Sequence, residues 1–134
     1  MTENQEKFEA SFKKLKKANV SLTEALERES DDLLVRDGII QRFEFTIELA
    51  WKTLQSYLRQ RDLIIKLPRD VLDQAFENGL IESVKEWGDL LTARNQSSHV
   101  YDEETSDDIY KTMKARKYLI DRLIEVLSGK LSKS

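Results

Sequence analysis

The side chains best suited to carry out chemistry are concentrated in residues 94–101, Arg-Asn-Gln-Ser-Ser-His-Val-Tyr. His99 is the only histidine of the chain, and an imidazole can exchange protons near neutrality because its ordinary pKa is about 6.5. Arg94 carries a permanent charge on a planar set of donors that fits phosphate oxygens. Together these two groups would suit the chemistry of a phosphodiester. A lone histidine near a helix end is more often a cap or a surface residue, however, and spacing alone favours that structural interpretation.

The placement of these side chains depends on whether the segment is a continuous helix. At 100° per residue, Arg94 and His99 would lie about 140° apart, so one helix face could not present both to one small target. Asn95 and His99, four residues apart, would share a face. Either the helix ends among residues 96–98, or two copies of the chain share the site. The acidic residues Asp102, Glu103 and Glu104 could hold Arg94 or raise the pKa of His99, or they could simply interact favourably with the dipole of the helix that follows.

The composition favours an all-α protein. Four glycines and one proline are too few for a sandwich or barrel, which needs frequent turns, and charged residues make up 35% of the chain. A length of 134 residues suits one domain with a real core. Because there is no cysteine and only one histidine, disulfides are excluded, and neither a zinc site within one chain nor another cofactor is expected.

The formal net charge of −3 argues against non-specific binding of nucleic acid through overall charge. A small local basic site is compatible with it. No apolar stretch reaches the roughly 18 residues that a membrane span needs, and no charged-then-apolar signal segment opens the chain. We therefore expect no membrane partner and a cytoplasmic location.

Apolar residues spaced by three and four predict five helices. The first covers about residues 3–28, where Asn19 interrupts the stripe and is expected to border the core. The second follows capping side chains at residues 30–32. It carries the most regular stripe of the chain, which consists of Ile40, Phe43, Ile47, Ala50, Leu54 and Tyr57.

The third and fourth helices lead to the polar segment. Pro68 suits the first position of the third helix, and Asn78-Gly79 suits its end, since glycine readily adopts the left-handed conformation found there. The apolar face of this helix is expected to consist of Leu72, Ala75 and Phe76. The fourth helix starts near Glu82 and brings the chain to Arg94.

A single fifth helix is expected over about residues 106–127. Thr105 is a plausible cap for its start, and Gly129 for its end. Arg116 takes the place of an apolar residue in its stripe, which could mark a point where the bundle opens.

Long helices joined by brief loops predict an up-and-down helical bundle of four to five helices. We find no internal repeat and no linker, so residues 1–134 are expected to form one domain, with a core of about residues 8–127 and a frayed tail over 128–134. Arg42 and Glu48 lie off the stripe of the second helix, where charges are normally surface residues.

The pattern Arg94-x4-His99-x-Tyr101 resembles the signature of the HEPN superfamily, small all-α proteins with an Arg-x(4–6)-His motif. One branch of it, labelled nucleotidyltransferase substrate-binding protein, is also similar to HEPN toxins paired with minimal nucleotidyltransferase antitoxins. Further segments resembling that branch are residues 42–52, 68–71, 75–76 and 79–81, with Trp87. The resemblance covers about residues 8–127, and it departs at Leu67, where a small capping residue is expected.

The resemblance implies a HEPN-like bundle that forms a homodimer and cleaves RNA without a metal ion. In that reaction His99 would deprotonate the attacking 2′-hydroxyl or protonate the leaving oxygen. Arg94 would stabilise charge on the pentacovalent phosphate, and Asn95 would bond to an oxygen or orient His99. Two Arg/His motifs would meet across the dimer, which suits the geometry above.

The resemblance also gives Tyr101 a role as a site of modification. In the paired systems, the nucleotidyltransferase transfers AMP from ATP to the motif tyrosine, and a bulky anion two residues from His99 would repel an RNA phosphate. The structural alternative is a half-buried aromatic residue that caps a neighbouring helix. Asp102, Arg42 and Glu48 are candidate supporting residues.

Three hypotheses follow. The first is a dimeric ribonuclease toxin neutralised by AMP transfer to Tyr101. The second is a non-catalytic subunit that binds a nucleotidyltransferase and positions its substrate. The third is a helical dimer whose motif is vestigial. The intact motif favours the first hypothesis, whereas the acidic net charge favours the second.

Overall fold

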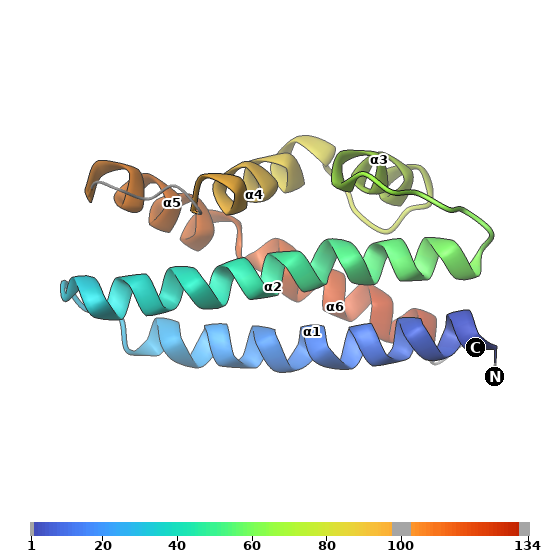
Figure 1. The fold of residues 1–134 in the computed structure, drawn as a ribbon, viewed down its shortest axis with the longest axis horizontal. Coiled ribbons are helices and arrows are strands. Elements are labelled where there is room, and N and C mark those ends of the chain that lie inside the picture. Colours follow the sequence, from blue (N-terminus) through green and yellow to red (C-terminus); the bar gives the residue numbers. More distant parts are fainter. Residues whose placement is uncertain (1, 98–102, 132–134) are drawn as a thin grey trace.

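The computed structural model describes residues 2–97 and 103–131. Within these residues the chain forms six helices and no strand, so the predicted all-α class is confirmed (Figure 1). The helices are α1 (Glu3–Glu27), α2 (Leu33–Gln60), α3 (Pro68–Glu77), α4 (Val84–Ser97), α5 (Glu103–Arg116) and α6 (Tyr118–Leu131). None of the helices in the described ranges has the length and apolar content that crossing a membrane requires.

The antiparallel hairpin of α1 and α2 is the framework on which the other helices pack. In Figure 1, α3, α4 and α5 line up along one side of α2, whereas α6 lies behind the hairpin. Thr2 caps α1 in a reciprocal arrangement with Gln5, and the Asp32 carboxylate accepts a hydrogen bond of 2.9 Å from the backbone N–H of Leu34. The two long helices predicted at the start of the chain are therefore present, with the cap expected for the second.

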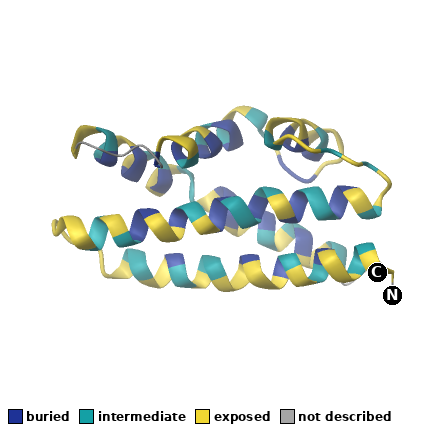
Figure 2. Ribbon diagram, viewed as in Figure 1, coloured by how far each residue is buried: buried dark blue, intermediate teal, exposed yellow. Residues whose placement is uncertain are grey.

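The core lies where the sequence stripe of α2 predicts it. Phe43, Ala50 and Leu54 are completely buried, and the other members of the stripe are at most 5% exposed. These side chains belong to one cluster of buried residues that draws on all six helices, seen as the dark blue inner faces in Figure 2. Asn19 borders this core as expected, and its Nδ2 donates to Asp121 Oδ1 of α6 at 2.8 Å.

Helix α3 begins and ends as predicted. Pro68 occupies its start, and Leu67 before it provides no side-chain cap, so the departure noted in the sequence leaves that helix end uncapped. Gly79 has a φ of +73°, and the next backbone N–H, of Leu80, donates to the carbonyl of Ala75 at 2.8 Å. The predicted apolar face is only partly right, because Phe76 is 49% exposed while Val71 is buried in its place.

The prediction of a single fifth helix was wrong, because the segment forms two helices, α5 and α6, that are separated at Lys117. Periodicity could not reveal this break, since the buried residues keep their spacing through it. The break lets α5 pack on α4 while α6 packs on α1. Two details change with it: Thr105 lies inside α5 rather than capping it, and α6 continues past Gly129.

Candidate functional site

Helix α4 ends with the first four residues of the polar segment, and the candidate site residues among them are Arg94 and Asn95. Its buried side chains fix its rotation against the rest of the bundle; they are Trp87, Leu90, Leu91 and Ala93. As a consequence Asn95 is exposed and the Arg94 side chain is 28% exposed. At the end of α4 the Ser97 hydroxyl donates to the Arg94 carbonyl at 2.6 Å.

The other candidate site residues of this region, His99, Tyr101 and Asp102, lie outside the described residues. Their distances to Arg94 and Asn95 therefore stay predictions, as do their roles. Helix α4 is continuous through Ser97. The two alternatives for bringing Arg94 and His99 to one target, a helix end among residues 96–98 or a shared site between two chains, both stay open.

Glu48 of α2 is the residue that the structure brings to Arg94. Its Oε2 lies 3.6 Å from Arg94 Nε and also accepts a hydrogen bond of 3.1 Å from Trp51 Nε1. Its other oxygen lies 3.3 Å from Lys52 Nζ, in the i,i+4 pair expected from the sequence. Arg94 Nε is buried and forms no hydrogen bond with a described residue, so Glu48 supplies the negative charge that compensates it.

The approach that defines this ion pair is that of one guanidinium nitrogen, Nε, at 3.6 Å from Glu48 Oε2. Because Nε is the atom nearest to Glu48, the pair does not require the two terminal nitrogens, which are the donors that commonly bind phosphate in a forked arrangement. A partly exposed guanidinium that is oriented from behind by a carboxylate can stabilise negative charge on a ligand.

Arg42, the other supporting candidate on α2, does not join this pair. Its Nε donates to Ser21 Oγ of α1 at 3.2 Å, and its NH1 donates to the Gly38 carbonyl at 3.2 Å. Arg42 and Glu48 are six residues apart, so they lie about 120° apart around α2. Arg42 therefore faces the α1–α2 groove rather than α4.

Arg69 is a basic residue near α4 whose contact the sequence analysis did not identify. Its NH2 donates to Thr92 Oγ1 at 3.1 Å, and a Cβ added at Gly88 would lie only 3.1 Å from its NH1. The missing side chain of Gly88 thus leaves room for the guanidinium against α4. Arg69 is exposed and forms no ion pair with any described residue, and Thr92 lies one turn before Asn95. The sequence signal for this contact was Gly88, a glycine inside a predicted helix at a position where it does not interrupt the apolar stripe.

Ion pairs fix α5, the helix that follows residues 98–102. Asp107 Oδ1 lies 2.6 Å from Arg36 NH1 of α2, and the Arg36 guanidinium lies 4.7 Å from the centre of the Tyr110 ring. Burial raises the pKa of Tyr110 above its ordinary value, and the charge of Glu29 adds to this effect. Helix α5 is thus held against the start of α2 by charge as well as by apolar packing.

The other end of α5 is tied to α4. Arg116 lies within 3.5 Å of Glu86 and 3.4 Å of Asp89. The Tyr118 hydroxyl donates to Glu86 at 2.5 Å, and this hydrogen bond, with partial burial and the carboxylate charge, raises the pKa of Tyr118. The interrupted stripe position at Arg116 therefore marks an electrostatic contact between helices rather than an opening of the bundle.

No group of three or more histidine, cysteine, aspartate or glutamate side chains within residues 2–97 and 103–131 is arranged to hold a metal ion. The geometry of the described site therefore rests on cations and a carboxylate: Arg94 with Glu48, and Arg69 beside Thr92. Such a set can bind and stabilise an anion, and a proton donor or acceptor would have to come from outside it.

Residues 10–127 match a protein family described as nucleotidyltransferase substrate binding protein like. A curated relative from Haemophilus influenzae, a probable ribonuclease HepT, is 30% identical over 112 residues, which are 77% of each chain. A crystal structure of a protein from Thermus thermophilus superimposes with a TM-score of 0.76 at 31% identity, covering 83% of this chain and 96% of that one. A second structure, of HI0074 from Haemophilus influenzae, is described as the fold of a substrate binding domain of a nucleotidyltransferase; its TM-score is 0.67 at 25% identity, covering 92% and 98% of the chains.

Proposed function

The chain belongs to the nucleotidyltransferase substrate-binding protein-like family, and from that premise we propose that it is the toxin of a two-gene pair. It acts as a metal-independent endoribonuclease, and a cognate nucleotidyltransferase neutralises it by transferring AMP to Tyr101. The observation that carries this proposal is the Arg94 guanidinium, which Glu48 holds at 3.6 Å at the start of the polar segment. The name of the relative, a probable ribonuclease, supports the same reaction class.

In the proposed reaction, the 2′-oxygen of the RNA attacks the adjacent phosphorus. A new P–O bond forms, the bond from phosphorus to the 5′-oxygen breaks, and the products are a 2′,3′-cyclic phosphate and a 5′-hydroxyl. His99 takes the proton from the 2′-hydroxyl or gives one to the leaving oxygen. Arg94 stabilises the charge on the pentacovalent phosphate, and Asn95 binds an oxygen or orients His99.

A homodimer forms part of the proposal, because two copies of the motif in one site would bring an Arg94 and a His99 to one phosphate even if α4 continued beyond Ser97. The side of α2 that carries Glu48 offers a face for this contact. Phe45, three residues before Glu48, is 58% exposed although it is a large apolar residue. An exposed aromatic residue of this kind is typical of an interface, since burying it against a second chain removes its apolar surface from water.

The proposed control of ribonuclease activity through Tyr101 rests on the negative charge of the transferred AMP group. An AMP group on the tyrosine adds a phosphate two residues from His99, where it would repel the RNA phosphate and block access to it. Such a toxin and its nucleotidyltransferase would meet in the cytoplasm, where ATP and RNA are both available.

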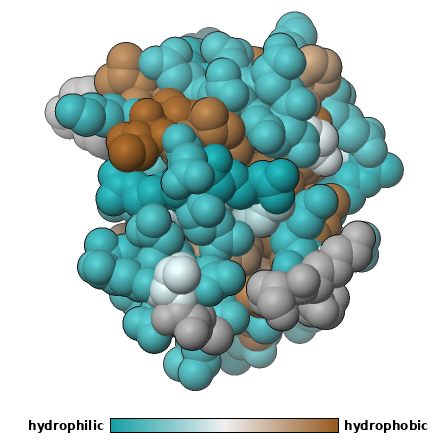
Figure 3. Space-filling model, turned by 90° about the vertical axis from the view of Figure 1, so that its right-hand side faces the viewer, coloured by the Kyte–Doolittle hydropathy of each residue, from teal (hydrophilic) through white to brown (hydrophobic). Residues whose placement is uncertain are grey.

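The second candidate is a non-catalytic subunit that docks a nucleotidyltransferase. Two observations favour it: the net charge of −3, and a hydrophobic area at the end of the molecule where α2 leads to α3. Ile64, Leu67 and Phe76 are 70%, 63% and 49% exposed there, and Figure 3 shows brown hydrophobic surface in the upper half of this end. Exposed apolar patches of this kind are typical of protein interaction sites.

The test is cleavage of a mixed RNA pool in EDTA by the unmodified protein and by His99→Ala. We expect cleavage by the unmodified protein alone, with the same far-ultraviolet circular dichroism for both. Cleavage by both would remove His99 from the mechanism. If neither protein cuts RNA and mass spectrometry finds no adduct on the unmodified protein, the ribonuclease proposal fails and the docking subunit takes its place. Arg59→Gln, which changes an exposed arginine near the far end of α2, controls for the effect of a substitution outside the motif.

A further inference from the structure

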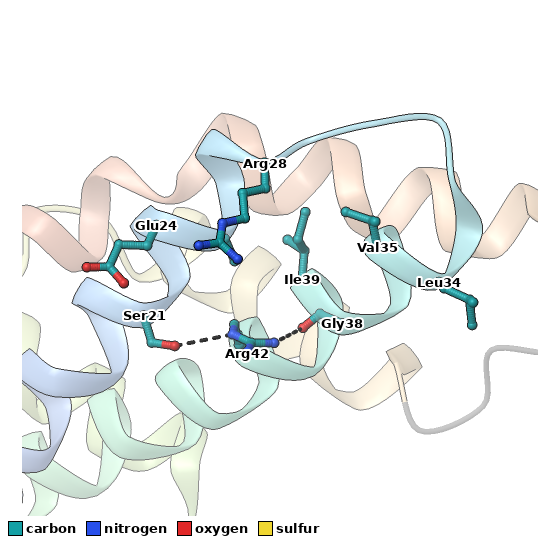
Figure 4. Close-up of a pocket in the computed structure, with 9 residues that line it drawn as sticks. Ser21, Glu24, Arg28, Leu34, Val35, Gly38, Ile39 and Arg42 are labelled. Carbon is teal, nitrogen blue, oxygen red and sulfur yellow. Dashed lines mark hydrogen bonds between the residues drawn. The ribbon is translucent and has the colours of Figure 1, made fainter.

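A cavity of about 310 Å³ lies between the end of α1 and the start of α2 (Figure 4). Its lining includes two arginines, Arg28 directly after α1 and Arg42 on α2, together with a group of aliphatic side chains. The other lining residues used below are Glu24, Val35 and Ile39. The volume is at the lower end of the roughly 300–1,000 Å³ that is common for small-molecule sites.

The two arginines bring positive charge to this cavity without a matching carboxylate. Arg42 is held in place by Ser21 and the Gly38 carbonyl, which engage its Nε and NH1 at 3.2 Å each. The Arg28 side chain extends from α1 toward it, as Figure 4 shows. Neither arginine forms an ion pair with a described residue. Two guanidinium groups that line one cavity repel each other, and an anion bound between them would relieve this repulsion.

The one carboxylate of the lining does not neutralise this pair. In Figure 4 the Glu24 side chain extends away from both guanidinium groups, and Glu24 forms no ion pair with a described residue. NH2 of Arg42 is not engaged by Ser21 or Gly38. Since Arg28 forms no side-chain hydrogen bond with a described residue, most of its donors are available to a ligand.

The opposite part of the cavity is apolar. Val35 of α2 and Ala25 of α1 are half-buried and present aliphatic surface to it, and Ile39, which is only 2% exposed, adds a small area beside them. A free inorganic anion would use only the arginines. A ligand that carries a planar or apolar group beside its anion would also cover the aliphatic side.

We infer that this cavity is a binding site for a phosphate monoester attached to a planar group, the class that includes nucleoside monophosphates. Arg28 and Arg42 bind the phosphate, and Val35 and Ile39 contact the planar group. The site is distinct from the Arg94–Glu48 pair, since Arg42 and Glu48 point in different directions from α2 and lie about 9 Å apart along its axis. The inference does not depend on ribonuclease activity, because the cavity lies within the described residues and needs neither His99 nor a second chain.

The test is isothermal titration of the full-length protein with AMP, adenosine and inorganic phosphate. We expect AMP to bind with a dissociation constant below a millimolar, and each of the other two to bind at least about tenfold more weakly, because each engages half of the site. Arg28→Gln and Arg42→Gln should each weaken AMP binding about tenfold or more, as the loss of a charge-assisted hydrogen bond predicts. Arg59→Gln makes the same change elsewhere on α2 and should leave the affinity unchanged.

The variants separate binding from folding. Arg42→Gln loses two internal hydrogen bonds and could lower stability, but Arg28→Gln removes no such contact and tests the site by itself. The inference is overturned if AMP does not bind the unmodified protein at millimolar concentration, or if Arg28→Gln binds it equally well. Equal affinity for adenosine would remove the role of the arginines, and equal affinity for phosphate would remove that of the aliphatic side chains.

Discussion

The contact between Glu48 and Arg94 allows a quantitative test of how α2 and α4 build the site. The two variants Glu48→Gln and Arg94→Gln, with their combination, form a double-mutant cycle for the pair. Both changes keep the approximate shape of the side chain and remove its charge. The cycle therefore isolates the interaction energy between the two groups from their other contacts.

The structure sets the expected size of this interaction. The two atoms lie 3.6 Å apart, and the side chains are 28% and 34% exposed. At an effective dielectric constant of 20, two charges at this distance attract each other by about 4–5 kcal/mol before desolvation is subtracted. Exposed pairs retain about 0.2–1 kcal/mol of such attraction. Because Arg94 Nε is buried, we expect a coupling energy at the top of this range, about 1 kcal/mol, with a shift in the urea midpoint of about 0.5 M for the single variants.

The measurement is urea unfolding followed by circular dichroism at low and high salt. The pair of Glu48 with Lys52 is the matched control, since it uses the same carboxylate but its lysine is 52% exposed. The coupling of Glu48 with Lys52 should be below about 0.5 kcal/mol, as is usual for i,i+4 pairs on a helix. High salt should reduce both couplings, and it should reduce the exposed Lys52 pair by the larger fraction.

Two results would contradict this reasoning. Additive single variants would mean that Glu48 does not hold Arg94 in solution. A coupling no larger than that of the Lys52 control would mean that the buried Nε does not strengthen the pair. If the protein cleaves RNA, Glu48→Gln should also lower the rate about tenfold without changing helicity, because Arg94 then loses its fixed orientation.

Three further predictions follow from the described contacts and from the polar segment. Gly38→Ala should raise the free energy of unfolding by about 0.5–1 kcal/mol, since the atom nearest to the added Cβ lies at an ordinary 3.7 Å. Gly79→Ala should lower the free energy of unfolding by about 1 kcal/mol, because φ is +73° there. Thermal unfolding of both variants measures the difference. Because the pKa of Tyr118 is raised, its neutral form stabilises the fold below pH 10, and this contribution is lost as the pH rises through the raised pKa. Above pH 10, Tyr118→Phe should therefore lose less thermal stability than the unmodified protein. Tyr101→Phe should still cleave RNA but should not gain the mass of AMP with the nucleotidyltransferase and ATP, and an adduct on this variant would exclude the site.

The long helices α1 and α2 were predictable because their apolar stripes are regular and because capping residues precede α2. The stripe of α2 coincides with buried residues at every position, and Asp32 and Pro68 start helices where the sequence places them. In these segments local preference and tertiary packing agree. Agreement of this kind is what makes periodicity a reliable guide.

The break between α5 and α6 was not predictable from the same pattern. A turn at Lys117 keeps Met113 and Ile120 on the buried side, so the apolar spacing is unchanged on either side of it. What distinguishes the two helices is their partners, α4 for one and α1 for the other. Partners that lie far away in the sequence leave no local signal, except that Arg116 replaces an apolar residue where it binds Glu86 and Asp89.

The roles of the candidate site residues stay predictions, and the sequence did not indicate the contact between Arg94 and Glu48. Arg94 was singled out by the motif, whereas the position of Glu48 on α2 indicated only a surface charge and the family resemblance made it a supporting candidate. Their contact joins two helices that the sequence could not place relative to each other. Arg42 shows the converse, because it shares a helix with Glu48 but faces α1 instead. Position along a helix determines the direction of a side chain, whereas the neighbour in that direction depends on the packing of the whole bundle.

The acidic net charge and the proposed RNA substrate are compatible once the charges are located. Several carboxylates of the chain are used in ion pairs between helices, such as Asp107 with Arg36 and Glu86 with Arg116. Those pairs tie α4 and α5 to the bundle on both sides of residues 98–102. Arg69, by contrast, has no carboxylate partner among the described residues and lies against α4 near Asn95. A phosphate that approaches this helix meets local cations rather than the average charge of the protein, and affinity for RNA should then depend on few contacts and fall gently with salt.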